Sequence, residues 1–300
     1  MRYYVTESKL SGVFSETFFL MKKNFVPLLV VNLILSVFSF ATALFSEAAT
    51  LALSFSSTGY YVQSILYSIL SLVISCLLLF LISPFVSAFC KVRCFSTMGG
   101  TQLSFAQTFR VTKIKFPYAL TSSLCLVVLS LILVPVIVLI AIFGAVGEMT
   151  SPSSLPIFII VVSIFVLGII YLAMHFLLVA DIAVNEELHG FKAVFKSFRL
   201  VTKGNYRKNA GHLLLFYGIM IAIELLLSFL VIRPLSQAGY VWVALLIALP
   251  VTVILAMFSS CYYAVVYKNA SLHMEGYTHF PYAVLHEGYT PSQNKGDYQQ

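Results

Sequence analysis

Residues 188–203 read LHGFKAVFKSFRLVTK, and related elements occur at residues 14–25 (FSETFFLMKKNF) and 105–116 (FAQTFRVTKIKF). In residues 188–203, apolar residues recur at spacings of three and four, with basic residues between them. This pattern predicts a helix that lies in the membrane interface, with aromatic rings toward the acyl chains and bases toward anionic headgroups. Each copy runs into a pair of long apolar segments. The sequence therefore predicts three repeat units, at about 10–90, 103–180 and 188–267.

The composition places most of the chain in lipid. Hydrophobic residues make up 60% of the 300 residues and charged residues 10%, against roughly 45–50% and about 25% in soluble domains. Each of six apolar stretches is longer than the roughly 18–20 residues that cross a hydrocarbon core as a helix. They lie near residues 25–45, 64–90, 118–146, 155–180, 212–232 and 241–267.

The predicted fold class is therefore all-α. We expect a single polytopic membrane domain over residues 1–267, with six transmembrane helices arranged as three hairpins, each preceded by a cytosolic amphipathic helix. Residues 268–300 are polar, contain several glycines and prolines, and are expected to form a flexible cytosolic tail.

The distribution of basic residues predicts the orientation. With both termini in the cytosol, 17 of the 18 lysines and arginines lie on the cytosolic side and only Arg233 lies outside, as the positive-inside bias requires. We therefore expect a multi-pass protein of the bacterial cytoplasmic membrane. Topology also accounts for the net charge of +7, so nucleic acid is not an expected partner.

The third connector supplies the candidate surface for contact with the bilayer. We expect it to bind anionic phospholipid headgroups or a membrane-protein partner. The alternative is that the connectors brace the ends of the spans, because bracing requires the same helix face. The candidate residues are Lys192, Lys196, Arg199, Lys203, Phe195 and Phe198.

Four polar residues within or at the ends of the predicted spans are further candidates. Glu224 lies roughly twelve residues into the fifth stretch, where a carboxylate is costly unless it is protonated or paired. It is either a proton- or cation-coupling site, or a protonated group that forms a hydrogen bond between helices or reaches toward the outer interface. His175, His212 and Asn32 are expected to form hydrogen bonds between helices or at the interface.

Motifs for catalysis and for metal binding are missing from the sequence. It contains no Gly-x-Ser-x-Gly, no HExxH and no phosphate-binding glycine loop. Asp181 and Asn185 would share a helix face, as an ion site requires, but the favoured interpretation is a helix end after which Asn185 begins the next helix. We expect no enzyme activity, no cofactor and no metal site.

Residues 181–216 resemble the membrane domain that is fused to some bacterial glycerophosphodiester phosphodiesterases, and its stand-alone relatives of unknown function. The shared pattern is an acidic helix end, then Gly190, a helix with Ala193 and Ser197-Phe198, and Lys203-Gly204-Asn205 before a span. In the fused relatives the chemistry belongs to a separate soluble domain, for which this sequence contains no candidate. The resemblance implies a membrane accessory module and transfers no catalytic residue.

Two functions are therefore expected. The first is a non-enzymatic integral membrane module that supports envelope or lipid processes through basic interfacial helices at the inner leaflet. The alternative is a small transporter or exporter in which Glu224 is the coupling carboxylate.

Overall fold

The computed structural model describes residues 10–54, 58–150, 168, 171, 174–203, 206–237 and 240–275, and every secondary-structure element within these ranges is a helix. Within these ranges five helices are long and apolar enough to cross a membrane, which makes the chain an all-α protein with several candidate spans. Most of the predicted stretch at 155–180 lies outside the described residues. The five candidates are Phe25–Thr42, Gln63–Met98, Phe105–Leu131, Gly211–Leu235 and Leu246–Leu272.

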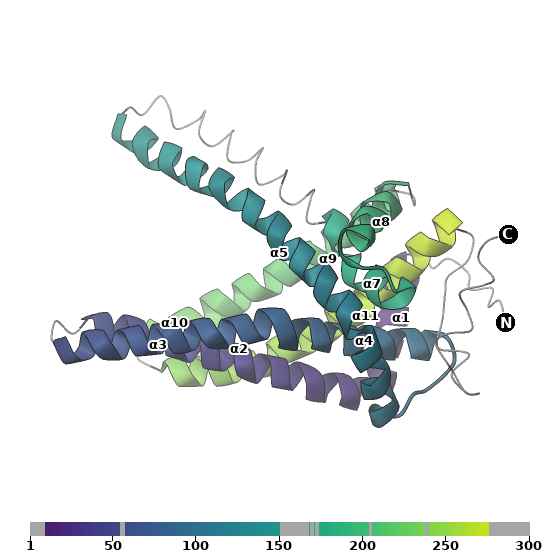
Figure 1. Cartoon of the computed structure of the whole chain (residues 1–300), viewed down its shortest axis with the longest axis horizontal. Helices are drawn as coiled ribbons and strands as arrows, with labels where there is room; N and C mark the ends of the chain where they lie inside the picture. Colours follow the sequence, from purple (N-terminus) through teal and green to yellow (C-terminus); the bar gives the residue numbers. More distant parts are fainter. Residues whose placement is uncertain are drawn as a thin grey trace.

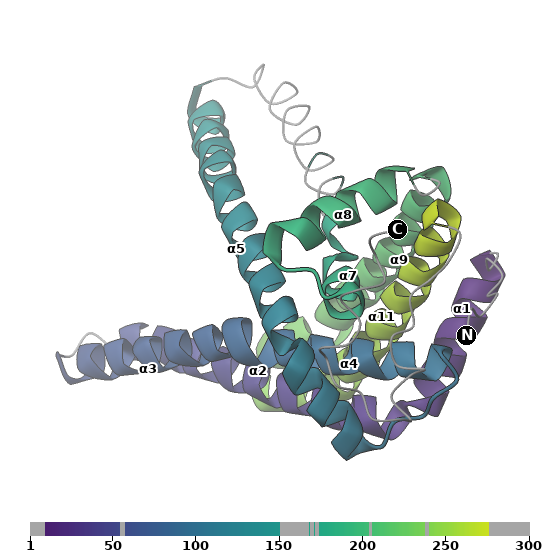
Figure 2. The same cartoon turned by 45° about the vertical axis from the view of Figure 1, so that its right-hand side comes forward.

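The N-terminal helices form a short element followed by a long pair. Helix α1 spans Leu10–Lys23, α2 spans Phe25–Ser54 and α3 spans Thr58–Leu77. Helices α2 and α3 lie side by side over most of their length (Figures 1 and 2). One hydrogen bond between them runs from Ser71 Oγ to the carbonyl oxygen of Thr42 over 3.4 Å.

Two of the long helices contain one wide π-helical turn each. Helix α3 passes through η1 (Leu78–Ile82) into α4 (Ser83–Met98), and α9 (Tyr206–Leu227) passes through η3 (Ser228–Ile232) into α10 (Arg233–Gln237). Each wide turn ends two residues before a proline, Pro84 or Pro234. Proline has no N–H and its ring crowds the preceding turn, so the helix widens there instead of breaking.

The remaining helices are α5 (Phe105–Thr150), α7 (Val179–Glu186), α8 (Gly190–Lys203) and α11 (Val241–Glu275). Helix α5 begins with a reciprocal cap. The Ser104 N–H donates to Gln107 Oε1 over 2.8 Å, and the Gln107 N–H donates to Ser104 Oγ over 3.2 Å. These bonds satisfy backbone donors that the first turn of a helix leaves open.

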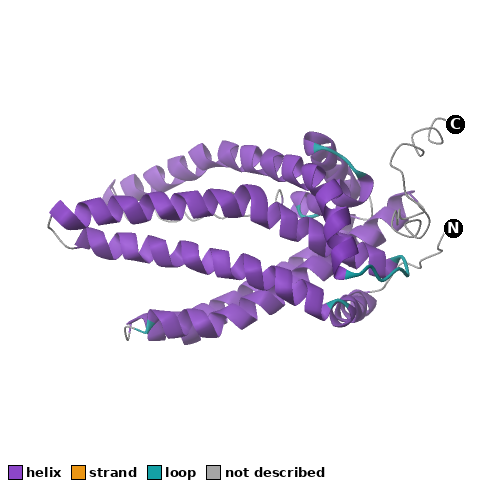
Figure 3. Ribbon diagram, turned by 60° about the horizontal axis from the view of Figure 1, so that its bottom comes forward, coloured by secondary structure: helices purple, strands orange, loops and turns teal. Residues whose placement is uncertain are grey.

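The hub is the region where α1, α4, the N-terminal part of α5, α7, α8 and the C-terminal part of α11 meet. Figures 1 and 3 show that the long helices extend away from it, and Figures 1 and 2 show α5 diverging from the α2–α3 pair. The largest fully buried side chains include Phe89 and Phe95 of α4, and Tyr262 and Tyr267 of α11. The Phe216 ring of α9 stacks on Tyr262 at 4.2 Å between centroids. The packed core is therefore concentrated at one end of the molecule.

Two predicted boundaries differ from the structure. The boundary at 267 falls inside α11, which continues to Glu275 because Lys268 forms an ion pair with Glu16 of α1 and the following residues through Ser271 are buried. The rest of the predicted tail lies outside the described residues. The interpretation of Asn185 as the start of the next helix is wrong. Asn185 is buried within α7, and α8 begins at Gly190.

Candidate membrane-surface site

Helix α8 packs one face on the hub and leaves the other face open. The inward side chains are small or aliphatic: Ala193, Val194, Ser197, Leu200 and Val201. The outward face carries aromatic and basic side chains: Phe191, Lys192, Phe195, Phe198, Arg199 and Lys203. The valines of the predicted apolar stripe thus turn inward, while its phenylalanines stay outside. Phe195 is 71% exposed, which would be costly in water and is favourable against acyl chains.

The same division recurs in the three connectors. Each contains a hydroxyl residue followed directly by phenylalanine: Thr17-Phe18, Thr108-Phe109 and Ser197-Phe198. All three hydroxyl residues are fully buried, whereas the phenylalanines are 55%, 49% and 40% exposed, respectively. Because consecutive helical residues point about 100° apart, the border between the packed face and the open face falls at the same place in each connector.

The buried hydroxyl groups are satisfied by backbone carbonyl groups. Thr17 donates to the Val13 carbonyl over 2.7 Å and Thr108 donates to the Ser104 carbonyl over 2.8 Å. Ser197 instead donates to the carbonyl of His175, a residue of another segment. The small polar residue therefore lets each connector lie close against its neighbours without leaving a buried group unpaired.

Eleven basic residues of the described chain fall into two groups. Four lysines turn inward and pair with acidic residues of other segments: Lys91 with Asp181, Lys115 with Glu187, Lys196 with Glu186, and Lys268 with Glu16. Seven bases on the connectors are exposed: Lys22, Lys23, Arg110, Lys113, Lys192, Arg199 and Lys203. Of the four predicted headgroup-binding bases on α8, Lys196 is thus engaged within the protein and the other three face outward.

His175 belongs to the support of α8. Its side chain is fully buried, Nδ1 lies 2.7 Å from the Tyr171 carbonyl oxygen, and its ring stacks on Phe198 at 4.5 Å between centroids. This ring stack and the hydrogen bond from Ser197 to the His175 carbonyl together hold Phe198 in its outward position. The structure therefore brings His175 together with Phe198.

The other predicted polar residues lie apart from one another. His212 is buried at the start of α9, and its carbonyl accepts a hydrogen bond from Tyr262 over 2.8 Å. Asn32 Nδ2 donates to the Leu28 carbonyl over 2.8 Å and lies 3.6 Å from Cys90 Sγ of α4. Glu224 is exposed on α9 and forms no ion pair or hydrogen bond with another described residue. Among the described residues, Glu224 therefore contacts neither His175 nor His212 directly.

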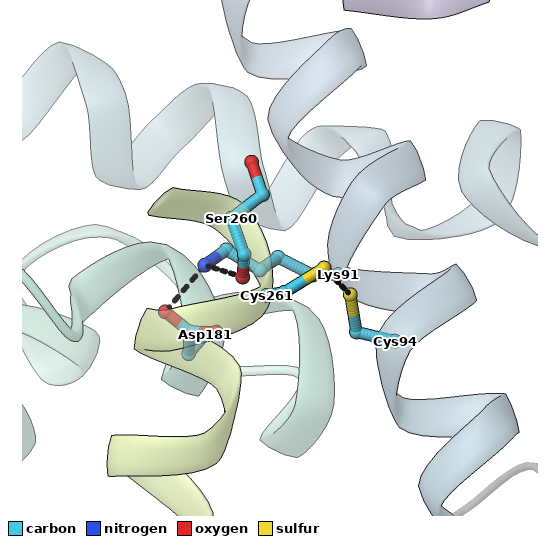
Figure 4. Close-up of polar contacts among 5 residues, drawn as sticks. All are labelled: Lys91, Cys94, Asp181, Ser260 and Cys261. Carbon is cyan, nitrogen blue, oxygen red and sulfur yellow. Dashed lines mark hydrogen bonds and ion pairs between the residues drawn. The ribbon is translucent and has the colours of Figure 1, made fainter. Parts of the chain in front are cut away.

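A buried ion pair between Lys91 and Asp181 is the feature that sequence reasoning missed (Figure 4). Lys91 Nζ of α4 lies 2.9 Å from Asp181 Oδ2 of α7, and both side chains are almost wholly buried. The same ammonium donates to the Ser260 carbonyl of α11 over 3.3 Å and lies 5.3 Å from the ring centroid of Tyr263. One side chain thus ties three helices together.

The environment of Asp181 is strongly desolvated. Burial raises the pKa of its carboxyl above the ordinary value, and the charge of Lys91 offsets only part of this effect. Oδ1 has no hydrogen-bond partner in the described part of the chain. The signal available in the sequence was one acidic and one basic residue, each at the end of an apolar stretch. Such residues are also typical of a helix end or of topology, so the pairing could not be inferred.

The described residues present an outward surface of aromatic and basic side chains on the three connectors. Within the described ranges, no three His, Cys, Asp or Glu side chains are grouped as a metal site. Cys94 Sγ and Cys261 Sγ lie 3.7 Å apart as buried thiols beside the ion pair (Figure 4). Comparison with known proteins found no match to a protein-family model, to a curated protein or to a solved structure.

Proposed function

We propose that this chain is a non-enzymatic integral membrane module of the bacterial cytoplasmic membrane, which supports envelope or lipid processes by binding anionic phospholipid headgroups of the inner leaflet. In this proposal six spans cross the bilayer, both termini are cytosolic, and the hub lies at the cytosolic interface. The resemblance of residues 181–216 to an accessory membrane domain agrees with such a role.

One observation carries the proposal. In all three connectors a buried hydroxyl residue stands next to an outward phenylalanine, and seven exposed bases lie on the same three connectors. Phenylalanine side chains enter the acyl boundary, and each base near an anionic surface contributes about 1 kcal/mol. The bases that pair with acidic residues are separate from this set, so the exposed bases are available to headgroups.

Brominated-lipid quenching tests the location of α8. The natural Trp242 is replaced by Phe, and Phe195→Trp provides one reporter on α8. In bilayers with phosphatidylglycerol, we expect lipids brominated near the headgroup to quench this reporter. A reporter that stays in water, with no quenching by any brominated lipid, would overturn the proposal.

A charge variant tests the headgroup contact. Lys192→Gln, Arg199→Gln and Lys203→Gln together should reduce the number of phosphatidylglycerol molecules that remain bound in native mass spectrometry, because three electrostatic contacts are lost. The matched control is Arg233→Gln, which removes an exposed base from α10, away from the connectors. Equal phosphatidylglycerol retention by the triple variant and the parent contradicts headgroup binding by α8.

A further inference from the structure

Glu224 lies near the middle of a candidate span and faces outward. The span Gly211–Leu235 places 13 residues before it (224 − 211) and 11 after it (235 − 224). Its side chain is exposed and is not engaged by any described residue. Hydrocarbon offers no hydrogen-bond donor, so a carboxyl group in this position is unfavourable until another molecule covers it. Glu224 lies about 16–20 Å from either end of the span at 1.5 Å per residue. A lipid headgroup at the membrane surface is therefore too far away to form a hydrogen bond with its carboxyl group.

The face of α9 around Glu224 has the spacing of a packing surface. Leu214 and Ile221 of α9 and Ser228, the first residue of η3, are spaced seven residues apart, and Glu224 and Leu225 lie between the last two. Leu214 and Ile221 are each 49% exposed and Leu225 is 51% exposed. A seven-residue repeat with one polar position is the pattern by which two helices pack with a left-handed crossing and a defined register.

We propose that this face of α9, formed by Leu214, Ile221, Glu224 and Leu225, binds a second copy of the chain across a two-fold axis. A two-fold contact brings the same residue of both copies together, so each Glu224 meets its counterpart at the same depth. A protonated carboxyl group both donates and accepts hydrogen bonds, and two of them satisfy one another. A second copy therefore supplies the missing partner without a charge of opposite sign. This interface is separate from the headgroup surface on the hub.

Energy transfer in liposomes tests the association. The full chain is labelled with donor or acceptor fluorophores and reconstituted at a series of lipid-to-protein ratios. Glu224→Leu should weaken dimerisation by about 3- to 30-fold, the range expected for one interhelical polar contact in a membrane. Glu224→Gln should dimerise like the parent, because an amide also donates and accepts. A parent that is monomeric at every ratio, or a Glu224→Leu variant that dimerises like the parent, would overturn the proposal.

Cysteine cross-linking tests which face of α9 is used. In a background with Cys76→Ser, which removes an exposed native thiol, a single cysteine is introduced at Ile221 or at Leu226. Leu226 lies on the opposite side of the helix from Glu224 and is 58% exposed. Mild oxidation should link two copies through Ile221→Cys and not through Leu226→Cys. Equal cross-linking at both positions contradicts the assignment. The triple charge variant of α8 should leave energy transfer unchanged, which separates this interface from the proposed function.

Discussion

The hub and the outer halves of the long helices are held together in different ways. In the candidate span Leu246–Leu272, which ends in the hub, 39% of the most apolar stretch of 18 residues is buried within the protein. The corresponding stretches of Gly211–Leu235 and Gln63–Met98 are 6% and 0% buried. Among the described residues, the hub also holds four ion pairs between segments. Helices α2 and α3 are instead joined by a 3.4 Å hydrogen bond from Ser71.

The difference follows from the solvent of each region. Lipid chains are as apolar as leucine, so burying leucine between helices in a bilayer gains little, and association depends on packing and on polar contacts. At the hub, aromatic stacking and paired charges fix the helices relative to one another. We therefore expect substitutions at the hub to cost much more stability than chemically similar changes in the outer halves.

The largest effect is expected at the Lys91–Asp181 pair. Lys91→Met or Asp181→Leu alone leaves one buried charge without its partner, which should cost about 3–5 kcal/mol. The double variant should lose far less than the sum, because neither charge remains. Unfolding of the four proteins in detergent, followed as a double-mutant cycle, measures this coupling. Additive losses would show that the pair does not stabilise the hub.

The same pair predicts a pH dependence. Because burial raises the pKa of Asp181, the folded state holds this proton more tightly than the unfolded state, whose carboxyl has a pKa of about 3.9. The contribution of the protonated carboxyl to stability is therefore complete below that pH and is lost as the pH rises through the folded-state pKa. Lys91→Met removes the opposing charge, so the variant should be less destabilised at pH 5 than at pH 8. A pH-independent difference from the parent contradicts this assignment.

A smaller loss is expected where α8 begins. Gly190 has a φ of +50°, and a Cβ added there would lie 3.1 Å from Cys125 Sγ of α5. Gly190→Ala therefore combines backbone strain with a steric clash, and should destabilise the hub by about 1–3 kcal/mol. The control is Gly218→Ala on the outward face of α9, where an added Cβ meets no atom within 4 Å. Equal unfolding temperatures for the two variants would remove the distinction between hub and outer helix.

The sequence predicted the features that depend on local pattern. Long apolar stretches indicate helices, so the candidate spans could be recognised. The hub depends on pairs far apart in the chain, such as Lys91 with Asp181 or Lys268 with Glu16. Counting the basic residues on each side of the membrane explains these lysines only by the orientation of the chain. The three-dimensional packing is needed to separate the inward, paired lysines from the exposed bases. The end of α11 was missed for the same reason, since its last turns are stabilised by α1.

The smallest effect is expected in the outer half of the α2–α3 pair. Ser71→Ala removes the hydrogen bond to the Thr42 carbonyl, and polar contacts of this kind in membrane proteins average about 0.6 kcal/mol. The carbonyl keeps its place in the helix of α2, so no buried group loses its only partner. The hub counterpart is Tyr267→Phe, which removes a hydroxyl that donates to Glu186 over 2.7 Å and accepts from Asn185 over 3.1 Å. That loss should reach about 1.5–3 kcal/mol because one partner is charged. If Ser71→Ala lowers the unfolding temperature as much as Tyr267→Phe, the outer helices share the stability of the hub and the contrast between the two regions fails.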